Sequence, residues 1–154
     1  MENLHYQIKI DAPIEKVYKT MLGLENKHTY EAWTSVFNPT STFEGTWEKE
    51  SKIYFVGTDE NGKKGGMIAK IEAHEPHKFV SIMHYGILDG ENEITSGEMV
   101  EQWAGGHENY TFESKDDATI VHVNVDVVSE NIDFFNDNYP LALEKLKEVI
   151  LGNK

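Results

Sequence analysis

The alternation of apolar and polar residues predicts a strand near the start of the chain, followed by helices. Over residues 4–11 apolar side chains stand at every second position. This period of two is typical of a half-buried strand. Pro13 suits the first turn of a helix, and apolar residues then repeat at helical spacing as far as Gly23. A second, weaker helical stretch covers residues 24–33. The repeating residues of the first helix are Ile14, Val17, Tyr18 and Met21.

The middle of the chain predicts antiparallel strands joined by turns. Asn61-Gly62 is a strong hairpin signal, because both residues tolerate positive φ. A second hairpin turns at Lys115-Asp116-Asp117, between the alternating segments around Tyr110 and 121–127. The pattern of residues 93–106 fits either a helical turn or an irregular edge. The other strands are expected at 41–44, 52–58, 66–73 and 79–88.

The end of the chain predicts a long helix with one apolar face. Ser129 is placed to cap its start, and Pro140 must either bend the helix or begin its main part. The apolar residues at helical spacing are Ile132, Phe135, Tyr139, Leu143, Leu146, Val149 and Ile150. Since no linker or repeat interrupts the chain, we expect residues 1–154 to form a single α+β domain.

Charge and composition exclude several classes of function. Acidic side chains number 27 against 14 basic ones, and the formal net charge is −13. Such a charge repels phosphate backbones and anionic lipids, so we expect no nucleic-acid partner. The chain has no cysteine, which excludes disulfides and thiolate chemistry. It shows neither a secretory signal pattern nor about 20 consecutive apolar residues, so we expect a cytoplasmic protein that does not insert into a membrane.

Two sequence motifs resemble the START-like helix-grip superfamily, also called SRPBCC or birch-pollen-allergen-like. Ile10-Asp11-Ala12-Pro13-Ile14-Glu15-Lys16-Val17-Tyr18 looks like its entry from strand to first helix, and Ile71-Glu72-Ala73-His74-Glu75-Pro76 looks like its strand-to-proline turn. The resemblance implies a curved antiparallel sheet of about six or seven strands that grips a long C-terminal helix, with two short helices after the first strand. The superfamily includes lipid carriers, hormone receptors, polyketide cyclases and oxygenase domains, so it assigns no activity.

Further segments resemble one branch, the C-terminal domain of the activator of the ninety-kilodalton heat-shock chaperone ATPase. They are His84-Tyr85-Gly86, Glu108-Asn109-Tyr110 and Tyr139-Pro140-Leu141-Ala142-Leu143-Glu144-Lys145-Leu146, together with Trp103. The branch implies a chaperone-associated protein partner. The activator also uses an N-terminal domain that this chain lacks, so we do not expect chaperone stimulation. The oligomeric state is not indicated.

Motifs for metals and cofactors are missing from the sequence. In His74-Glu75-Pro76-His77 the proline prevents helical presentation of two ligands, which favours a solvated turn. A calcium-like loop that starts at Gly57 has Ile68 where a bidentate glutamate is required. No nucleophile elbow, phosphate loop or dinucleotide fingerprint occurs. We therefore expect no metal and no cofactor, and no catalytic residue is assigned.

His84 is the ionisable side chain that attracts most interest. It lies inside the apolar run 79–88, and imidazole exchanges protons near neutral pH. Glu108 and Tyr110 could occupy neighbouring positions of the sheet. A histidine hydrogen-bonded within the sheet, a ligand contact and an acid–base catalyst all remain open at this point. Tyr6 and Tyr54 are weaker candidates.

The aromatic residues exceed what a plain seam between sheet and helix requires. In this fold a curved sheet and a helix close incompletely, so large side chains either fill the gap or line a pocket. We expect a pocket that binds a small apolar or amphipathic molecule. The alternatives are an acid–base enzyme of cyclase or dehydratase type that uses the same cavity, and a chaperone-associated interaction module. The candidate ligand-binding residues are Trp33, His84, Trp103, Tyr110, Phe135 and Tyr139.

Overall fold

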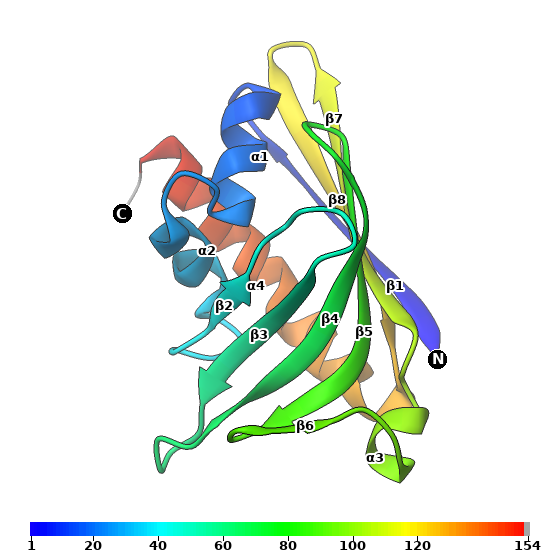
Figure 1. Cartoon of the computed structure of the whole chain (residues 1–154). Coiled ribbons are helices and arrows are strands. Elements are labelled where there is room, and N and C mark those ends of the chain that lie inside the picture. The colour runs from blue at the N-terminus through cyan, green and yellow to red at the C-terminus, as the bar shows by residue number, and fades with distance from the viewer. Residues whose placement is uncertain (153–154) are drawn as a thin grey trace.

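The structure, a computed structural model, describes residues 1–152 and consists of one antiparallel sheet with helices against one of its faces (Figure 1). The α+β helix-grip architecture expected from the sequence is confirmed. The sheet has eight strands, because one short strand was not recognised in the sequence. The elements are β1 (Glu2–Ile10), α1 (Ile14–Leu22), α2 (Lys27–Thr34), β2 (Thr42–Gly45), β3 (Lys52–Thr58), β4 (Lys64–Glu75), β5 (Phe79–Asp89), β6 (Asn92–Ile94), α3 (Glu98–Glu101), β7 (Gly106–Lys115), β8 (Ala118–Val127), the 3₁₀ turn η1 (Ser129–Asn131) and α4 (Ile132–Leu151).

The sheet joins the two ends of the chain. Its strand order is β1-β8-β7-β5-β4-β3-β2, and β6 pairs with β5 beside this path. The first strand therefore pairs with the last, with Tyr6 opposite Val123. The turn at Asn61-Gly62 connects β3 and β4 as an antiparallel hairpin, as the sequence predicted. The segment that the sequence left undecided contains β6 and the single helical turn α3.

The helix ends show where local sequence signals hold and where they fail. Gly23 ends α1 with a φ of 67°, a left-handed conformation that glycine adopts without steric cost. The prediction that Ser129 caps the last helix is wrong. Ser129 lies inside η1, a turn in which the Asn131 N–H donates to the Val128 carbonyl. The Ser129 hydroxyl donates to the Glu130 carboxylate. Helix α4 is 20 residues long and continues through Pro140. None of the helices described is long and apolar enough to cross a membrane.

The main core lies between the sheet and the three longer helices. Leu146 and Ala142 of α4 are fully buried against it, as are Val17 of α1 and Val121 of β8. Trp33 of α2 is anchored there as well, because its indole N–H donates to the Met21 carbonyl at 2.8 Å. Helix α4 contacts α2, β1 and α1. It therefore rests on one edge of the sheet, and the opposite half of the sheet curves away from it (Figure 1).

A bulge between β4 and β5 changes which side chains face the helices. Ile68 pairs with Gly86 and Ala69 pairs with His84, so Tyr85 is an extra residue in β5. An extra residue increases local twist and shifts the inward and outward alternation by one position. As a result His84 and Ile87, three positions apart, both face the interior. Simple alternation from His84 would have placed Gly86 inward instead.

Replacing Leu146 by alanine tests whether the apolar stripe of α4 forms the seam with the sheet. Leu146 is 0% exposed, and Leu146→Ala should lower the free energy of unfolding by about 2–5 kcal/mol. Leu141 lies on the same helix, is 58% exposed and is the matched control. Leu141→Ala should change the free energy of unfolding by about 0.5 kcal/mol or less. Chemical denaturation measures both. Equal effects of the two substitutions would contradict this packing.

Candidate functional site

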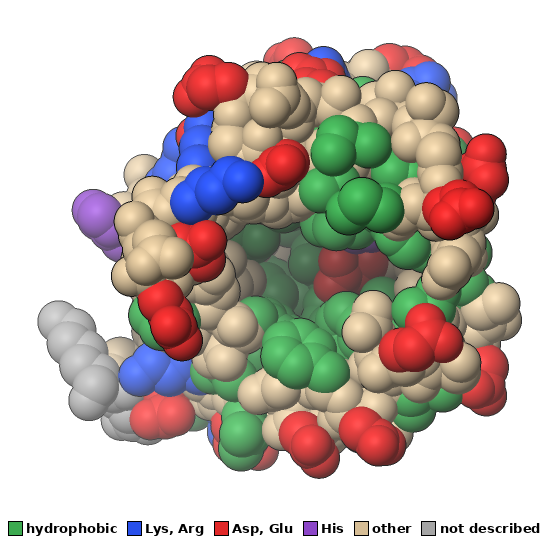
Figure 2. Space-filling model, turned by 90° about the horizontal axis from the view of Figure 1, so that it is seen from below, with side chains coloured by type: hydrophobic (Ala, Val, Ile, Leu, Met, Phe, Trp, Pro, Cys, Tyr) green, Lys and Arg blue, Asp and Glu red, His purple; other side chains and the backbone are tan. Residues whose placement is uncertain are grey.

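A cavity of about 360 Å³ lies between the sheet and the helices α2 and α4. Figure 2 shows its opening at one end of the molecule, with hydrophobic side chains around the rim and an acidic side chain in its depth. Phe134, which is 47% exposed, belongs to the lining and reaches the outside. The walls are mainly aromatic: Tyr30, Trp33, Phe37, Phe55, Trp103, Tyr110, Phe134, Phe135 and Tyr139.

The structure brings all six candidate residues of the sequence analysis into the lining of this cavity. They are Trp33 from α2, His84 from β5, Trp103 from the loop after α3, Tyr110 from β7, and Phe135 and Tyr139 from α4. That they bind a ligand stays a prediction. Among the other candidates, Tyr6 donates its hydroxyl to Asn136, and Tyr54 donates to Glu93. Trp47 is buried among Tyr30, Phe43 and Phe55 and does not line the cavity.

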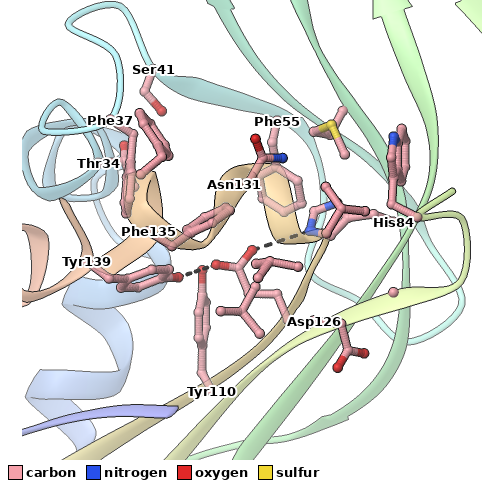
Figure 3. A pocket seen from close by; sticks show the side chains of 18 of the residues that line it. Thr34, Phe37, Ser41, Phe55, His84, Tyr110, Asp126, Asn131, Phe135 and Tyr139 are labelled. Atoms are coloured by element: carbon pink, nitrogen blue, oxygen red, sulfur yellow. Dashed lines mark hydrogen bonds and ion pairs between the residues drawn. The ribbon is translucent and has the colours of Figure 1, made fainter. Parts of the chain in front are cut away.

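Glu108 forms the polar end of the cavity. Its carboxylate Oε2 accepts a hydrogen bond from the Tyr139 hydroxyl, and its Oε1 lies 3.3 Å from His84 Nε2. Both interactions are drawn in Figure 3, where Tyr110 points toward the same region. The side chains of Glu108 and His84 are only 17% and 16% exposed. One carboxylate thus connects α4 with two strands of the sheet.

Strand register explains why Glu108 and His84 meet. In the pairing of β5 with β7, Glu108 stands opposite Ile82 and His84 opposite Gly106. Glu108 and His84 are therefore diagonal neighbours on the same face, a separation that long side chains bridge. Glu108 also follows the inward alternation of β7, two positions before the buried Tyr110. Glu108 was named above only as a neighbour of His84 in the sheet, and this alternation is the sequence signal that places it inside. The lining residues Phe37 and Phe55 were not among the candidates.

The hydrogen bonds of His84 favour one arrangement of its protons. With the proton on Nε2, the ring donates to Glu108 and leaves a lone pair on Nδ1. The Nδ1 atom is buried and has no hydrogen-bond partner among the described residues. A carboxylate oxygen only accepts, so the contact requires the proton on Nε2.

Three tyrosine hydroxyls are enclosed beside Glu108. Burial raises the pKa of Tyr30, Tyr110 and Tyr139 above the usual 10.0, and the negative charge of Glu108 raises it further. These hydroxyls therefore remain neutral and can donate hydrogen bonds at any physiological pH.

Asp126 is the second acidic residue of the lining, but its carboxylate is engaged elsewhere. It accepts hydrogen bonds from the Asn3 side chain and from the His107 backbone N–H. Burial alone would raise the pKa of this carboxyl, and these hydrogen bonds outweigh it, so the pKa lies below its usual value. In Figure 3 Asp126 points away from the cluster around Tyr110 and Tyr139.

Of the two histidines considered above as metal ligands, His74 contacts core residues and His77 lies in the predicted turn. His74 is not in a solvated turn: it lies on β4, its Nδ1–H donates to the Trp47 carbonyl at 2.6 Å, and its Nε2 accepts from the Tyr18 hydroxyl. Only His77 lies in the turn, with a φ of 67°. Within residues 1–152, no three His, Asp or Glu side chains form a group able to hold a metal ion.

Comparison with known proteins gives the fold but no family assignment. No family model and no curated protein matches the sequence. Among solved structures, the Aha1 dimer from Colwellia psychrerythraea is similar with a TM-score of 0.69 and 24% identity, over 100% of this chain and 99% of that one. A protein from Nitrosomonas europaea is similar with a TM-score of 0.71 and 13% identity, over 99% and 96% of the two chains.

CalU16 from Micromonospora echinospora also matches, with a TM-score of 0.67 and 12% identity, over 98% of this chain and 66% of that one. Likenesses at such low identity show the fold alone. Together with the architecture described above, they show that this chain has the START-like helix-grip fold.

Spectroscopic titration of the tyrosines tests the enclosed polar cluster. In the folded protein the hydroxyls of Tyr30, Tyr110 and Tyr139 should stay protonated well above pH 10.0, their usual pKa. In the unfolded chain the same tyrosines ionise near that value. The stability gained by burying them as neutral groups is therefore complete below pH 10.0 and is lost as the pH rises above it. Phenolate absorbance, recorded with circular dichroism, should show late ionisation that coincides with unfolding.

The variant Glu108→Gln provides the comparison. Removing the negative charge should move this late ionisation to lower pH, since the carboxylate is one of its causes. If all seven tyrosines ionised together near pH 10 while the fold stayed intact, the cluster would not be enclosed as described.

Proposed function

We propose that this chain, with its START-like helix-grip fold, binds a small and mainly apolar molecule that carries a hydrogen-bond donor at one end. The observation that supports this most strongly is the open cavity with aromatic walls and one carboxylate at its polar end. Its volume of about 360 Å³ falls in the range of small-molecule sites. Such sites typically combine apolar walls with a few placed polar groups.

The aromatic walls favour burial of an apolar body. Phe55, Phe135 and Trp103 come from three different elements and face the same space. Removing apolar surface from water contributes about 25 cal/mol for each Å², so even a compact hydrocarbon gains several kcal/mol before the cost of association. A ligand of this kind is expected to bind with micromolar affinity, about 8 kcal/mol.

The Glu108 carboxylate favours a donor on the ligand. Tyr139 and His84 each use one of its oxygens, and each oxygen can accept a further hydrogen bond. A hydroxyl or amine that reached this end would meet an acceptor, whereas a ligand carboxylate would meet a like charge. Anionic ligands should therefore bind less well, and the net charge of −13 opposes them further.

An acid–base enzyme in the same cavity is the second candidate. The pair of His84 and Glu108 favours it, since a histidine beside a carboxylate in an apolar pocket is a common arrangement for proton transfer. Native mass spectrometry of protein purified without detergent identifies a bound molecule, which can then be incubated with the protein. Recovery of the same molecule favours a binder, and its conversion into another compound favours an enzyme.

Tryptophan fluorescence reports on the proposed site, because Trp33 and Trp103 line the cavity and Trp47 does not. Adding decanol or adamantanemethanol, which are neutral and transparent at the wavelengths used, should shift the emission and raise the melting temperature by mass action. Trp103→Phe should remove part of the shift. Trp47→Phe, the matched control, should keep it.

Two outcomes would count against the proposal. If neither probe changes the emission or the melting temperature, the cavity does not bind apolar molecules of this size. If Trp47→Phe abolishes the shift and Trp103→Phe preserves it, the probes bind elsewhere.

A further inference from the structure

We propose that the ligand is an organic cation, an apolar body with an ammonium-like group that lies against Glu108. This inference rests on the proposed function and specifies the chemical class that the same cavity selects. Three features of the described residues carry it: the charges in the lining, the partners of Glu108, and the aromatic rings around it.

The lining provides negative charge without a compensating fixed cation. Glu108 and Asp126 are its acidic residues, and among the residues described no lysine or arginine side chain joins them there. Asp126 is held by Asn3 and His107, so Glu108 is the carboxylate that faces the cavity. A bound molecule therefore meets one negative charge at the inner end.

The partners of Glu108 are a tyrosine hydroxyl and an imidazole N–H. Tyr139 donates its hydroxyl to one oxygen, and His84 donates Nε2–H to the other. Hydrogen bonds stabilise the carboxylate, but no lysine or arginine side chain lies in the described lining to balance its charge, and the Glu108 side chain is only 17% exposed. A cation beside Glu108 would supply the missing opposite charge. Hydrogen bonds to charged groups are also stronger than neutral ones.

Aromatic rings flank both donors of Glu108. The ring of Phe55 lies 5.8 Å from that of His84. The rings of Phe37 and Phe135 lie 5.0 Å and 6.1 Å from that of Tyr139. Ammonium groups are attracted to the faces of aromatic rings within about 6 Å, and more strongly away from water. In Figure 3 the rings of Phe37, Phe55 and Phe135 surround the space in front of the carboxylate. An aromatic wall with a carboxylate at its end is thus complementary to an organic cation.

Three probes with one shape test this charge preference. Adamantanemethylammonium, adamantanemethanol and adamantanecarboxylate share one rigid hydrocarbon and differ in charge. Calorimetric titration at fixed salt should give the tightest binding for the cation, by about tenfold or more over the alcohol, and the weakest for the carboxylate. Glu108→Gln keeps the shape of the side chain and removes its charge, so it should bring the cation and the alcohol to similar affinities.

The control variant removes a charge from the same strand outside the cavity. Glu113 lies on β7, is 56% exposed as a side chain and is absent from the lining. Glu113→Gln should preserve the preference for the cation, because an exposed charge acts on the ligand only through screened, long-range attraction.

The possible results separate this inference from the proposed function. If the alcohol binds the unmodified protein as tightly as the cation does, the inference is wrong and the proposed function stands. If Glu113→Gln removes the preference as fully as Glu108→Gln does, the overall charge causes it, and the role given to Glu108 is wrong. If none of the three probes binds, both proposals fail. A cation preference that only Glu108→Gln removes supports the inference.

Discussion

A curved sheet cannot close completely over a single helix, and the other features of this protein follow from that constraint. Helix α4 packs on β1, α1 and α2, and the half of the sheet formed by β3, β4 and β5 stands opposite, across a gap. Bulges in the pairing of β4 with β5 increase this curvature. Aromatic side chains occupy part of the gap, and a cavity of about 360 Å³ remains.

Glu108 places a carboxylate at the inner end of this gap. A carboxylate enclosed between a sheet and a helix loses hydration, and removing either of its donors would leave it poorly compensated. Tyr139 and His84 offset part of this cost and fix the orientation of the carboxylate. An apolar residue at this position would pack without such a cost. The position of Glu108 at the inner end of the cavity is the observation from which we propose a ligand with a hydrogen-bond donor.

The sequence predicted the elements well where the periodic segments are long. Strand β3 was predicted with its observed bounds, and the apolar face of α4 was identified despite Pro140. Local signals failed where elements are short: β6 has three residues and α3 has four, too few to establish a period. Ser129 looked like a cap because the 3₁₀ turn before α4 leaves no periodic trace.

The site was predictable in its aromatic part and only partly in its polar part. Large aromatic residues on elements with a buried face are placed inside by burial alone, which brought Trp33, Phe135 and Tyr139 into the lining. Glu108 looks like a surface residue, because charged side chains are rarely buried. Its place beside His84 depends on the register between β5 and β7, which are separated by β6 and α3 along the chain. Such long-range register is not encoded in any one segment.

A crystal structure of the protein with adamantanemethylammonium would show whether the cavity holds an organic cation against Glu108. We expect the hydrocarbon to lie between Phe55 and Phe135, with the ammonium nitrogen at about 3 Å from a carboxylate oxygen of Glu108. A hydrocarbon bound on the outer face of the sheet, or a cavity that side chains fill while the probe stays in solvent, would contradict it.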